Sequence, residues 1–226
     1  MRDPMRNIVI IGNGITAELL YEYLQHDDRY QIEAFSVDSQ YIQDDRFFNR
    51  PVVDLANLPE RYPPGDYGVL MAVGYGDLNR NRERIFARLK AMGCSIETYI
   101  HPDAKVYSPH IGEGALIMPN ALIDVFAHVG ANTVVWGNCT VAHHAEVGPN
   151  CWLASGCVLS AGVEIGTNSF IGVSATVVNN VRVGSHNIIG AGALVVRNTG
   201  DFKVYISRQT EVFRLGSEDY LRFSKL

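Results

Sequence analysis

Apolar residues recur at every sixth position from Ile111 to Val195, and none of the fifteen positions is missed. Small residues occupy nearly every position four places after these apolar anchors. A repeat of six matches neither the 3.6-residue period of a helix nor the two-residue period of an ordinary strand. It is typical of a parallel β-helix, in which three hexapeptides form one triangular coil and residues eighteen apart stack about 4.8 Å apart. The pattern therefore predicts a three-sided prism with the anchors inside.

Two further columns repeat at intervals of eighteen residues within this prism. A glycine follows every third anchor, at Gly112, Gly130, Gly148, Gly166 and Gly184. We expect these glycines to adopt a corner conformation that a side chain would resist. A polar column consists of His110, His128, Glu146, Glu164 and Arg182. We interpret it as an outward ladder of weakly compensating charges. A metal ion between His128 and Glu146 is the alternative, and we predict no metal.

The segment before the repeat has the pattern of a small α/β domain. An apolar run at residues 7–11 predicts a buried parallel strand. The residues that follow, Gly12-Asn13-Gly14-Ile15-Thr16-Ala17, fit the G-x-G-x-x-G/A turn that opens a nucleotide-binding helix. Asp38 ends the next predicted strand, about where such a unit places an acidic residue. The turn favours phosphate binding, and a tight turn without a ligand is the alternative.

These patterns divide the chain into three parts. Residues 1–100 form a Rossmann-like domain, with further strands at 32–37, 51–53, 69–73 and 95–100 and a helix that starts near Asn79. Residues 101–198 form the β-helix. Residues 199–226 form a tail without a clear repeat, ending in a short helix that begins near Ser217. Four apolar residues pack this helix against the prism or a neighbouring subunit, namely Phe213, Tyr220, Leu221 and Phe223.

Composition narrows the class of protein and its location. The 226 residues carry a net charge of −5, which argues against nucleic acid as the main partner. No apolar run of about 18 residues predicts a membrane span, and the N-terminus lacks a signal peptide, so we expect a cytoplasmic protein. Three of the four cysteines, Cys139, Cys151 and Cys157, fall on small interior positions of the repeat. They are expected to be core residues rather than nucleophiles.

Six short motifs give the chain a specific resemblance. They are Ile10-Ile11-Gly12-Asn13-Gly14, Val73-Gly74-Tyr75 with Asn79 and Arg82, Ile100-His101-Pro102, Ile111-Gly112-Glu113-Gly114, Ala142-His143-His144, and Ile189-Gly190-Ala191-Gly192-Ala193. Up to about residue 205 the chain resembles the bacterial sugar O-/N-acyltransferases related to sialic acid O-acetyltransferase. These include enzymes that acetylate nucleotide-linked 4-amino sugars. The resemblance implies a left-handed β-helix, a homotrimer, and acetyl-CoA lying in a groove between adjacent prisms.

The resemblance also implies roles for individual residues. His143 matches the general base of the family, whereas His144 stands where the family has an acid, which leaves open what orients His143. Trp152 and Trp136 replace a histidine and an asparagine of the family, and both are expected to wall the acceptor pocket or to pack at the trimer seam. CoA is expected to contact Ala161, Gly162, Val173, Ala191 and Arg197, with Lys203 as a second candidate for its phosphates. The nucleotide is expected to contact Gly12, Asn13, Gly14, Asp38, Val73 and Tyr75.

The function predicted from these features is acyl transfer from acetyl-CoA to an amine or hydroxyl of a nucleotide-linked sugar, as in surface-polysaccharide or glycan biosynthesis. His143 would take the proton from the attacking group, and the amide of Ala161 or Gly162 would stabilise the oxyanion. Two alternatives stay open. One is a non-catalytic trimer that senses a nucleotide, in which His143 and His144 are solvated surface groups. The other is a transferase for a longer acyl group.

Overall fold

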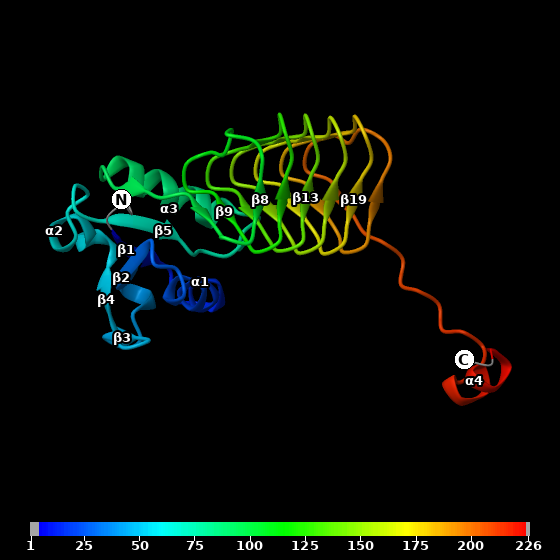
Figure 1. Ribbon diagram of the computed structural model, residues 1–226, viewed down its shortest axis with the longest axis horizontal. Coiled ribbons are helices and arrows are strands. Elements are labelled where there is room, and N and C mark those ends of the chain that lie inside the picture. The colour runs from blue at the N-terminus through cyan, green and yellow to red at the C-terminus, as the bar shows by residue number, and fades with distance from the viewer. Residues whose placement is uncertain (1–4, 225–226) are drawn as a thin grey trace.

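The computed structural model describes residues 5–224, which form an α/β region beside one end of a long prism (Figure 1). The strands of the α/β region are β1 (Arg6–Ile11), β2 (Tyr30–Val37), β3 (Arg46–Phe47), β4 (Arg50–Asp54), β5 (Gly68–Met71) and β6 (Ser95–Ile96). They form one sheet in the order β3-β4-β2-β1-β5-β6, parallel except for the β3–β4 pair. The helices of this region are α1 (Ile15–Gln25), α2 (Leu58–Arg61) and α3 (Arg80–Ala91), and two 3-10 turns lie at Ser39–Tyr41 and Leu55–Asn57.

Strand β1 is buried on both faces, as its apolar run predicts. Ile8 and Ile10 pack with α1 and with side chains of the prism, whereas Val9 and Ile11 pack with Leu89 of α3. The sheet therefore separates two cores, and the core on the α1 side continues into the prism.

The prism begins earlier than the sequence pattern suggests. The strand predicted at 95–100 is wrong as a single element, because it is divided between two sheets. β6 pairs with β5 of the α/β region, whereas β7 (Tyr99–Ile100) pairs with the first full coil of the prism. Glu97 and Thr98 between them join the two parts of the chain, so almost no linker is present.

The prism has three parallel sheets, which we name by what lies on them. The covered face packs against the α/β region and contains β7, β9 (Leu116–Ile117), β12 (Val134–Val135), β15 (Trp152–Leu153), β18 (Phe170–Ile171), β21 (Ile188–Ile189) and β23 (Val204–Tyr205). The open face contains β8 (Lys105–Val106), β10 (Leu122–Ile123), β13 (Thr140–Val141), β16 (Val158–Leu159), β19 (Thr176–Val177) and β22 (Leu194–Val195). The ladder face contains β11 (His128–Val129), β14 (Glu146–Val147), β17 (Glu164–Ile165) and β20 (Arg182–Val183).

Strand pairing follows the predicted spacing of eighteen residues, as in Val134 with Trp152 and Trp152 with Phe170. The anchors lie inside, with Ile117, Val135 and Leu159 fully buried. Parallel sheets built from hexapeptide repeats fit the left-handed β-helix and the N-terminal α/β region expected from the sequence. The Rossmann-like character of that region and the trimer stay predictions.

The prediction that the glycine column adopts a special corner conformation is wrong. None of these glycines has a positive φ angle, and the left-handed corner positions lie elsewhere, on a six-residue register that includes Asn120, Asn132 and His144. A Cβ added to Gly130 would instead lie 2.5 Å from the backbone of Gly148 on the next coil. The column is glycine because neighbouring coils approach too closely for a side chain.

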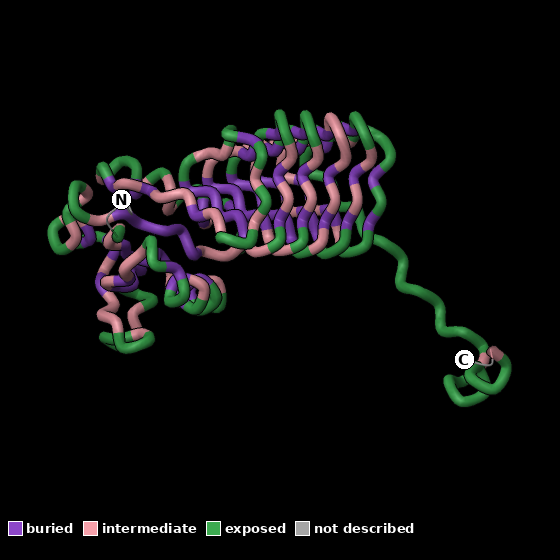
Figure 2. Tube along the Cα trace, in the orientation of Figure 1, coloured by how far each residue is buried: buried purple, intermediate pink, exposed green. Residues whose placement is uncertain are grey.

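The prism also extends further than its apolar period. β23 pairs with β21, so the covered face continues to Tyr205 although the six-residue pattern ends at Val195. Beyond it the tail leaves the far end of the prism and reaches α4 (Ser217–Ser224), which lies apart from the body (Figure 1). Figure 2 shows the tail exposed along its length, and its apolar residues Phe213, Tyr220, Leu221 and Phe223 are exposed. The alternative that they pack against the chain's own prism is therefore wrong.

Within residues 5–224 we find no helix with the length and apolar character needed to span a bilayer.

Candidate functional site

A cavity of about 810 Å³ lies at the carboxyl ends of β1, β2 and β5. This is where open parallel sheets bind ligands, because strand ends and helix N-termini meet there. Five of the predicted nucleotide contacts line it, namely Gly12, Asn13, Gly14, Asp38 and Val73. The sixth, Tyr75, is not among its lining residues and contacts the prism instead.

Gly12 is needed for the shape of this cavity. Its φ angle is +124°, and an added Cβ would lie 2.7 Å from the carbonyl oxygen of Ala72. The amide of Gly12 donates to the Ser36 carbonyl at 2.9 Å. The first turn of the motif thus brings β1, β2 and the end of β5 together at the edge of the cavity.

Two arginines of α3 also line the cavity, and the sequence analysis missed them. Arg88 forms an ion pair with the carboxylate of Asp38, and Arg84 donates to Asp77 at 3.4 Å. Guanidinium groups suit phosphate oxygens because they offer paired N–H donors with a fixed charge. Arg84 and Arg88 are four residues apart, which places them on one face of the helix. This spacing is the sequence signal from which the pair could have been predicted.

Four aromatic side chains gather where the α/β region meets the covered face. The Tyr75 ring lies 5.1 Å from the Trp152 ring and 5.0 Å from the Phe170 ring, and Trp136 lies 5.6 Å from Trp152. Tyr75 is 54% exposed, whereas Trp152 is 5% exposed beneath it. Tyr75 and the two tryptophans expected at the acceptor pocket therefore form one cluster, adjoining the cavity through Val73 and Gly74.

His143 and His144 lie in the turn between β13 and β14, which we call the histidine corner. Both are exposed, and their Nδ1 atoms are 3.1 Å apart. His144 has a φ angle of 60° and its ring lies 4.9 Å from the ring of Phe126 on the coil before. In a neutral pair one Nδ1 donates and the other accepts. When His143 donates through Nδ1, its Nε2 atom keeps the lone pair that a base needs.

The predicted CoA contacts fall on two different corners. Ala161, Gly162 and Arg197 share the histidine corner, and the Gly162 amide donates to the His143 carbonyl at 3.2 Å. Gly162 is therefore unsuited as an oxyanion donor, whereas the Ala161 amide has no acceptor within residues 5–224. Val173 and Ala191 lie instead between the covered and open faces, on the same corner as Trp136.

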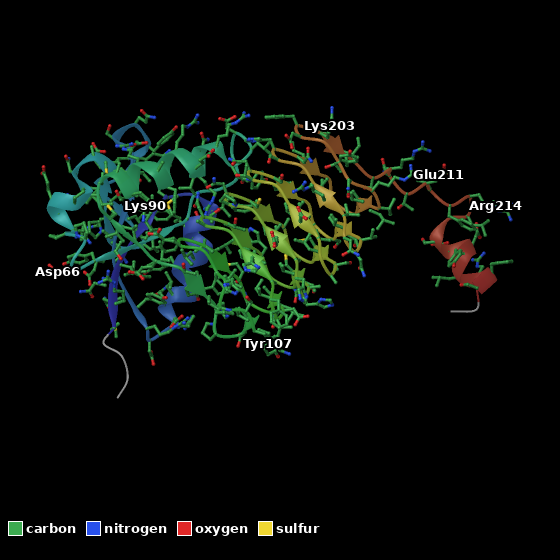
Figure 3. All side chains as sticks on the ribbon, turned by 90° about the horizontal axis from the view of Figure 1, so that it is seen from above. Asp66, Lys90, Tyr107, Lys203, Glu211 and Arg214 are labelled. Atoms are coloured by element: carbon green, nitrogen blue, oxygen red, sulfur yellow. The ribbon has the colours of Figure 1, made fainter. Side chains whose placement is uncertain are left out.

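Lys203 lies directly before β23, at the end of the prism from which the tail leaves (Figure 3).

The ladder face carries a shallow hollow of about 880 Å³ over the polar column. The His110 and His128 rings stack at 4.2 Å, and Arg182 donates to Glu164 at 2.8 Å. Glu146 pairs in register with both His128 and Glu164, so the ladder is only partly compensated. Among the described residues no three His, Cys, Asp or Glu side chains form a group that could hold a metal ion.

The interior cysteines have the surroundings of core residues. The Sγ atoms of Cys139 and Cys157 are 3.5 Å apart, as their spacing of eighteen predicts. Burial raises the pKa of the Cys151 thiol to about 12. A buried, protonated thiol is a poor nucleophile, which agrees with the interpretation of Cys151 as a packing residue. Cys139 and Cys157 are also buried.

The three parallel sheets and the six-residue repeat give the chain the architecture of a hexapeptide-repeat β-helix. Residues 144–179 match the family model "Bacterial transferase hexapeptide (six repeats)". No curated protein sequence matches the chain.

Solved structures of acetyltransferases have the same fold as this chain. The acetyltransferase domain of PglB from Neisseria gonorrhoeae FA1090, in complex with acetyl coenzyme A, is 27% identical, with a TM-score of 0.78 over 88% of this chain and 95% of that chain. A histidine-to-alanine mutant of GDP-perosamine N-acetyltransferase from Caulobacter crescentus, in complex with CoA and GDP-perosamine, is 29% identical. Its TM-score is 0.78, over 88% of this chain and 92% of that chain. WeeI from Acinetobacter baumannii AYE, at 19% identity and a TM-score of 0.71, shares the fold. The predicted resemblance to sugar acyltransferases is confirmed.

Proposed function

We propose that this chain is an acetyl-CoA-dependent acyltransferase whose acceptor is the amino or hydroxyl group of a nucleotide-linked sugar. One observation carries the proposal. Over 88% of its length the chain has the fold of an acetyltransferase domain solved with acetyl-CoA and of a GDP-perosamine N-acetyltransferase solved with CoA and GDP-perosamine. The cavity at the strand ends and the histidine corner support the proposal, because they offer a candidate position for the acceptor and one for the base.

In this proposal each predicted domain has its own role. Residues 1–100, as a Rossmann-like domain, would hold the nucleotide through the turn from Gly12 to Gly14 and through Arg84 and Arg88. Residues 101–198 would hold CoA and carry out transfer, and residues 199–226 would form the tail. The cytoplasmic location expected from the sequence stays a prediction.

The active form would be a homotrimer, and the prism itself supports this. The histidine corner lies between the open and ladder faces, so in a three-sided prism it is opposite the covered face. The nucleotide cavity and the aromatic cluster lie on the side of the covered face. One chain therefore holds its base and its acceptor cavity on opposite sides, and a closed ring of copies would bring the histidine corner of one to the cavity of the next. The same arrangement would place the CoA contacts at the histidine corner of one copy across a groove from Val173 and Ala191 of the next copy.

In this site His143 is the general base. The acceptor nitrogen or oxygen attacks the thioester carbonyl carbon while His143 Nε2 takes its proton. The amide of Ala161 donates to the oxyanion. The C–S bond then breaks, and the departing CoA sulfur receives the proton from His143. His144 accepts from His143 Nδ1 throughout and so holds its tautomer, which is the part that the family assigns to an acid.

The aromatic cluster would receive the sugar. Tyr75, Trp136 and Trp152 adjoin the nucleotide cavity, and aromatic rings pack well against the apolar face of a sugar ring. Val173 and Ala191 would contact CoA through their backbone, and Arg197 would meet its phosphates.

The test is the release of free thiol from acetyl-CoA in the presence of UDP-, dTDP- and GDP-linked amino and deoxy sugars. With the correct acceptor we expect His143→Ala to lower kcat by about 10²–10⁴-fold with little change in CoA affinity. His128→Ala is the matched control, because His128 is an exposed histidine on the ladder face. Full activity of His143→Ala would refute its assignment. Absence of release with every acceptor, together with nucleotide binding but no binding of acetyl-CoA, would favour the non-catalytic sensor. Thiol release from a longer acyl-CoA but not from acetyl-CoA would show that the donor carries the longer acyl group.

A further inference from the structure

Arg82 lies on α3 and its side chain is completely buried. Nη1 donates to the carbonyl oxygens of Met71, at 3.2 Å, and Val73, at 2.7 Å. Nη2 donates to the carbonyl oxygen of Asn132 at 3.2 Å and to its side-chain Oδ1 at 2.8 Å. One guanidinium therefore joins the end of β5 to a turn of the prism.

This arginine has no carboxylate among its hydrogen-bond acceptors within residues 5–224, and its Nε atom is buried without a partner there. Burial lowers its pKa to about 9. A buried charge that is solvated only by neutral carbonyls contributes little net stability compared with an apolar residue of similar size. What the guanidinium supplies is a fixed fork of donors, which holds several acceptors in one geometry.

The two groups that Arg82 joins belong to the two halves of the proposed reaction. Val73 and Gly74 line the nucleotide cavity, and Tyr75 lies against Trp152 and Phe170 of the covered face. Asn132 lies at the corner between the ladder and covered faces, in a left-handed conformation with a φ angle of 56°. The bonds of Arg82 thus fix where this cavity-lining segment lies relative to the prism.

A column of asparagines continues the connection along the same corner. The side-chain amide of Asn132 donates to Asn150 Oδ1 at 2.8 Å, and that of Asn168 donates to Glu83 of α3 at 2.9 Å. Asn79, also buried, donates through its side chain to the Ser169 carbonyl at 3.3 Å. The helix that carries Arg82 and its cap are therefore tied to two coils, those of Asn132 and Asn168, and Asn150 on the coil between them bonds to Asn132.

The turn that follows this cavity-lining segment is under backbone strain. Asp77, Leu78 and Asn79 are three consecutive residues with positive φ angles of 53°, 48° and 63°. Such conformations persist only where the surroundings enforce them, and they occur often at functional sites. Here the turn is closed by the amide of Asn79, which donates to the Tyr75 carbonyl at 3.1 Å. Arg82 on one side and Asn79 on the other thus hold residues 73–75.

We infer that Arg82 is a positioning residue that sets the cavity-lining segment 73–75 against the prism, so that a bound nucleotide-linked sugar reaches the aromatic cluster in one place. The inference rests on the proposed function. Transfer reactions depend steeply on this placement, since an error of about 1 Å can cost about 10²-fold in rate.

The test compares Arg82→Lys and Arg82→Met with Arg80→Met, a control on the same helix at an exposed residue. A lysine keeps the charge but cannot bridge the carbonyls of Val73 and Asn132 with one planar fork. For Arg82→Lys we expect kcat for the nucleotide-linked sugar to fall about 10- to 100-fold. We expect the KM for acetyl-CoA, and the Kd for the matching nucleoside diphosphate from calorimetry, to change less than about threefold, within the scatter of single contacts. Arg80→Met should match the wild type.

A folded Arg82→Lys protein with wild-type kcat would overturn the inference, as would a loss of nucleotide affinity as large as the loss of kcat. If Arg82→Met does not fold, Arg82→Lys decides. If the wild type transfers to no acceptor, the proposed function fails separately. Hydrogen exchange at residues 73–79 then tests the positioning role. Faster exchange there in Arg82→Lys but not in Arg80→Met supports it, and equal exchange in both variants overturns it.

Discussion

Replacing Gly12 by alanine tests how the cavity at the strand ends is built. The new Cβ would lie 2.7 Å from the Ala72 carbonyl oxygen, whereas ordinary contacts of this kind begin near 3.4 Å. The Ala72 amide donates to the Ile11 carbonyl at 2.9 Å, so the atom that must move belongs to the pairing of β1 with the end of β5. The clash cannot be relieved by turning a side chain, because it falls on backbone.

Two costs add at this position. A non-glycine residue at a φ angle of +124° is strained by about 1–3 kcal/mol. Forcing apart a packed backbone contact costs about 1–3 kcal/mol more. The free energy of unfolding should therefore fall by about 2–6 kcal/mol, a large part of the 5–15 kcal/mol typical of a domain. Because the shift opens the rim of the cavity, nucleotide affinity should fall at least about tenfold, which is about 1.4 kcal/mol of binding free energy.

Urea denaturation and calorimetry with nucleoside diphosphates measure the two effects. Gly14→Ala is the control for stability, because Gly14 has a φ angle of −102° and a Cβ there would have no atom within 4 Å. Its free energy of unfolding should change by less than about 1 kcal/mol. Equal stability of the two variants would refute the close-approach argument, and an unchanged nucleotide affinity in Gly12→Ala would show that the cavity at the strand ends is not the nucleotide site.

Two further predictions concern charge and thiol chemistry. Arg88→Met should weaken nucleoside diphosphate binding about tenfold in calorimetry, since a charge-assisted hydrogen bond contributes about 1.5–3 kcal/mol; an unchanged Kd would remove Arg88 from the site. Because burial raises the pKa of Cys151 to about 12, its thiol stays protonated at pH 8. Mass spectrometry should find it unreacted with iodoacetamide until urea unfolds the chain, and rapid labelling of the native protein would contradict its burial.

Much of the prism could be predicted from the sequence because its constraints repeat. Each anchor meets the residues eighteen places before and after it, so one local rule is tested many times along the chain. The glycine column shows the limit of this reasoning. The spacing identified the glycines, but their cause is the distance between the backbones of Gly130 and Gly148, and a sequence contains no distance. The extension to β23 was missed for a related reason, because that coil pairs through its backbone after the apolar period has ended.

The candidate site was predicted where a motif is continuous and missed where helices bring residues in from afar. The turn from Gly12 to Gly14 is local, and it lines the cavity as expected. Arg84 and Arg88 reach the same cavity from α3, and Arg88 meets Asp38 across fifty residues of chain. Only the fold reveals that pairing. The same holds for Arg82, which the motif marked as part of the resemblance without indicating that it lies inside the protein.

The histidine corner and the proposed nucleotide cavity lie on opposite sides of the prism, which leads to a sharper test of assembly. Consider His143→Ala and the double variant Arg84→Met with Arg88→Met, each of which should be nearly inactive alone. If base and cavity come from different copies, random mixing of the two variants by joint refolding leaves about one site in four with both parts intact, because each part is intact with a probability of one half. Activity should then return to about a quarter of the wild-type value. If both parts belonged to the same chain, every site would lack one of them and mixing would restore nothing. As a control, the two variants are refolded separately and then mixed, so that any activity that returns reports exchange of subunits between assembled oligomers. The absence of recovery in the jointly refolded sample would refute the shared site.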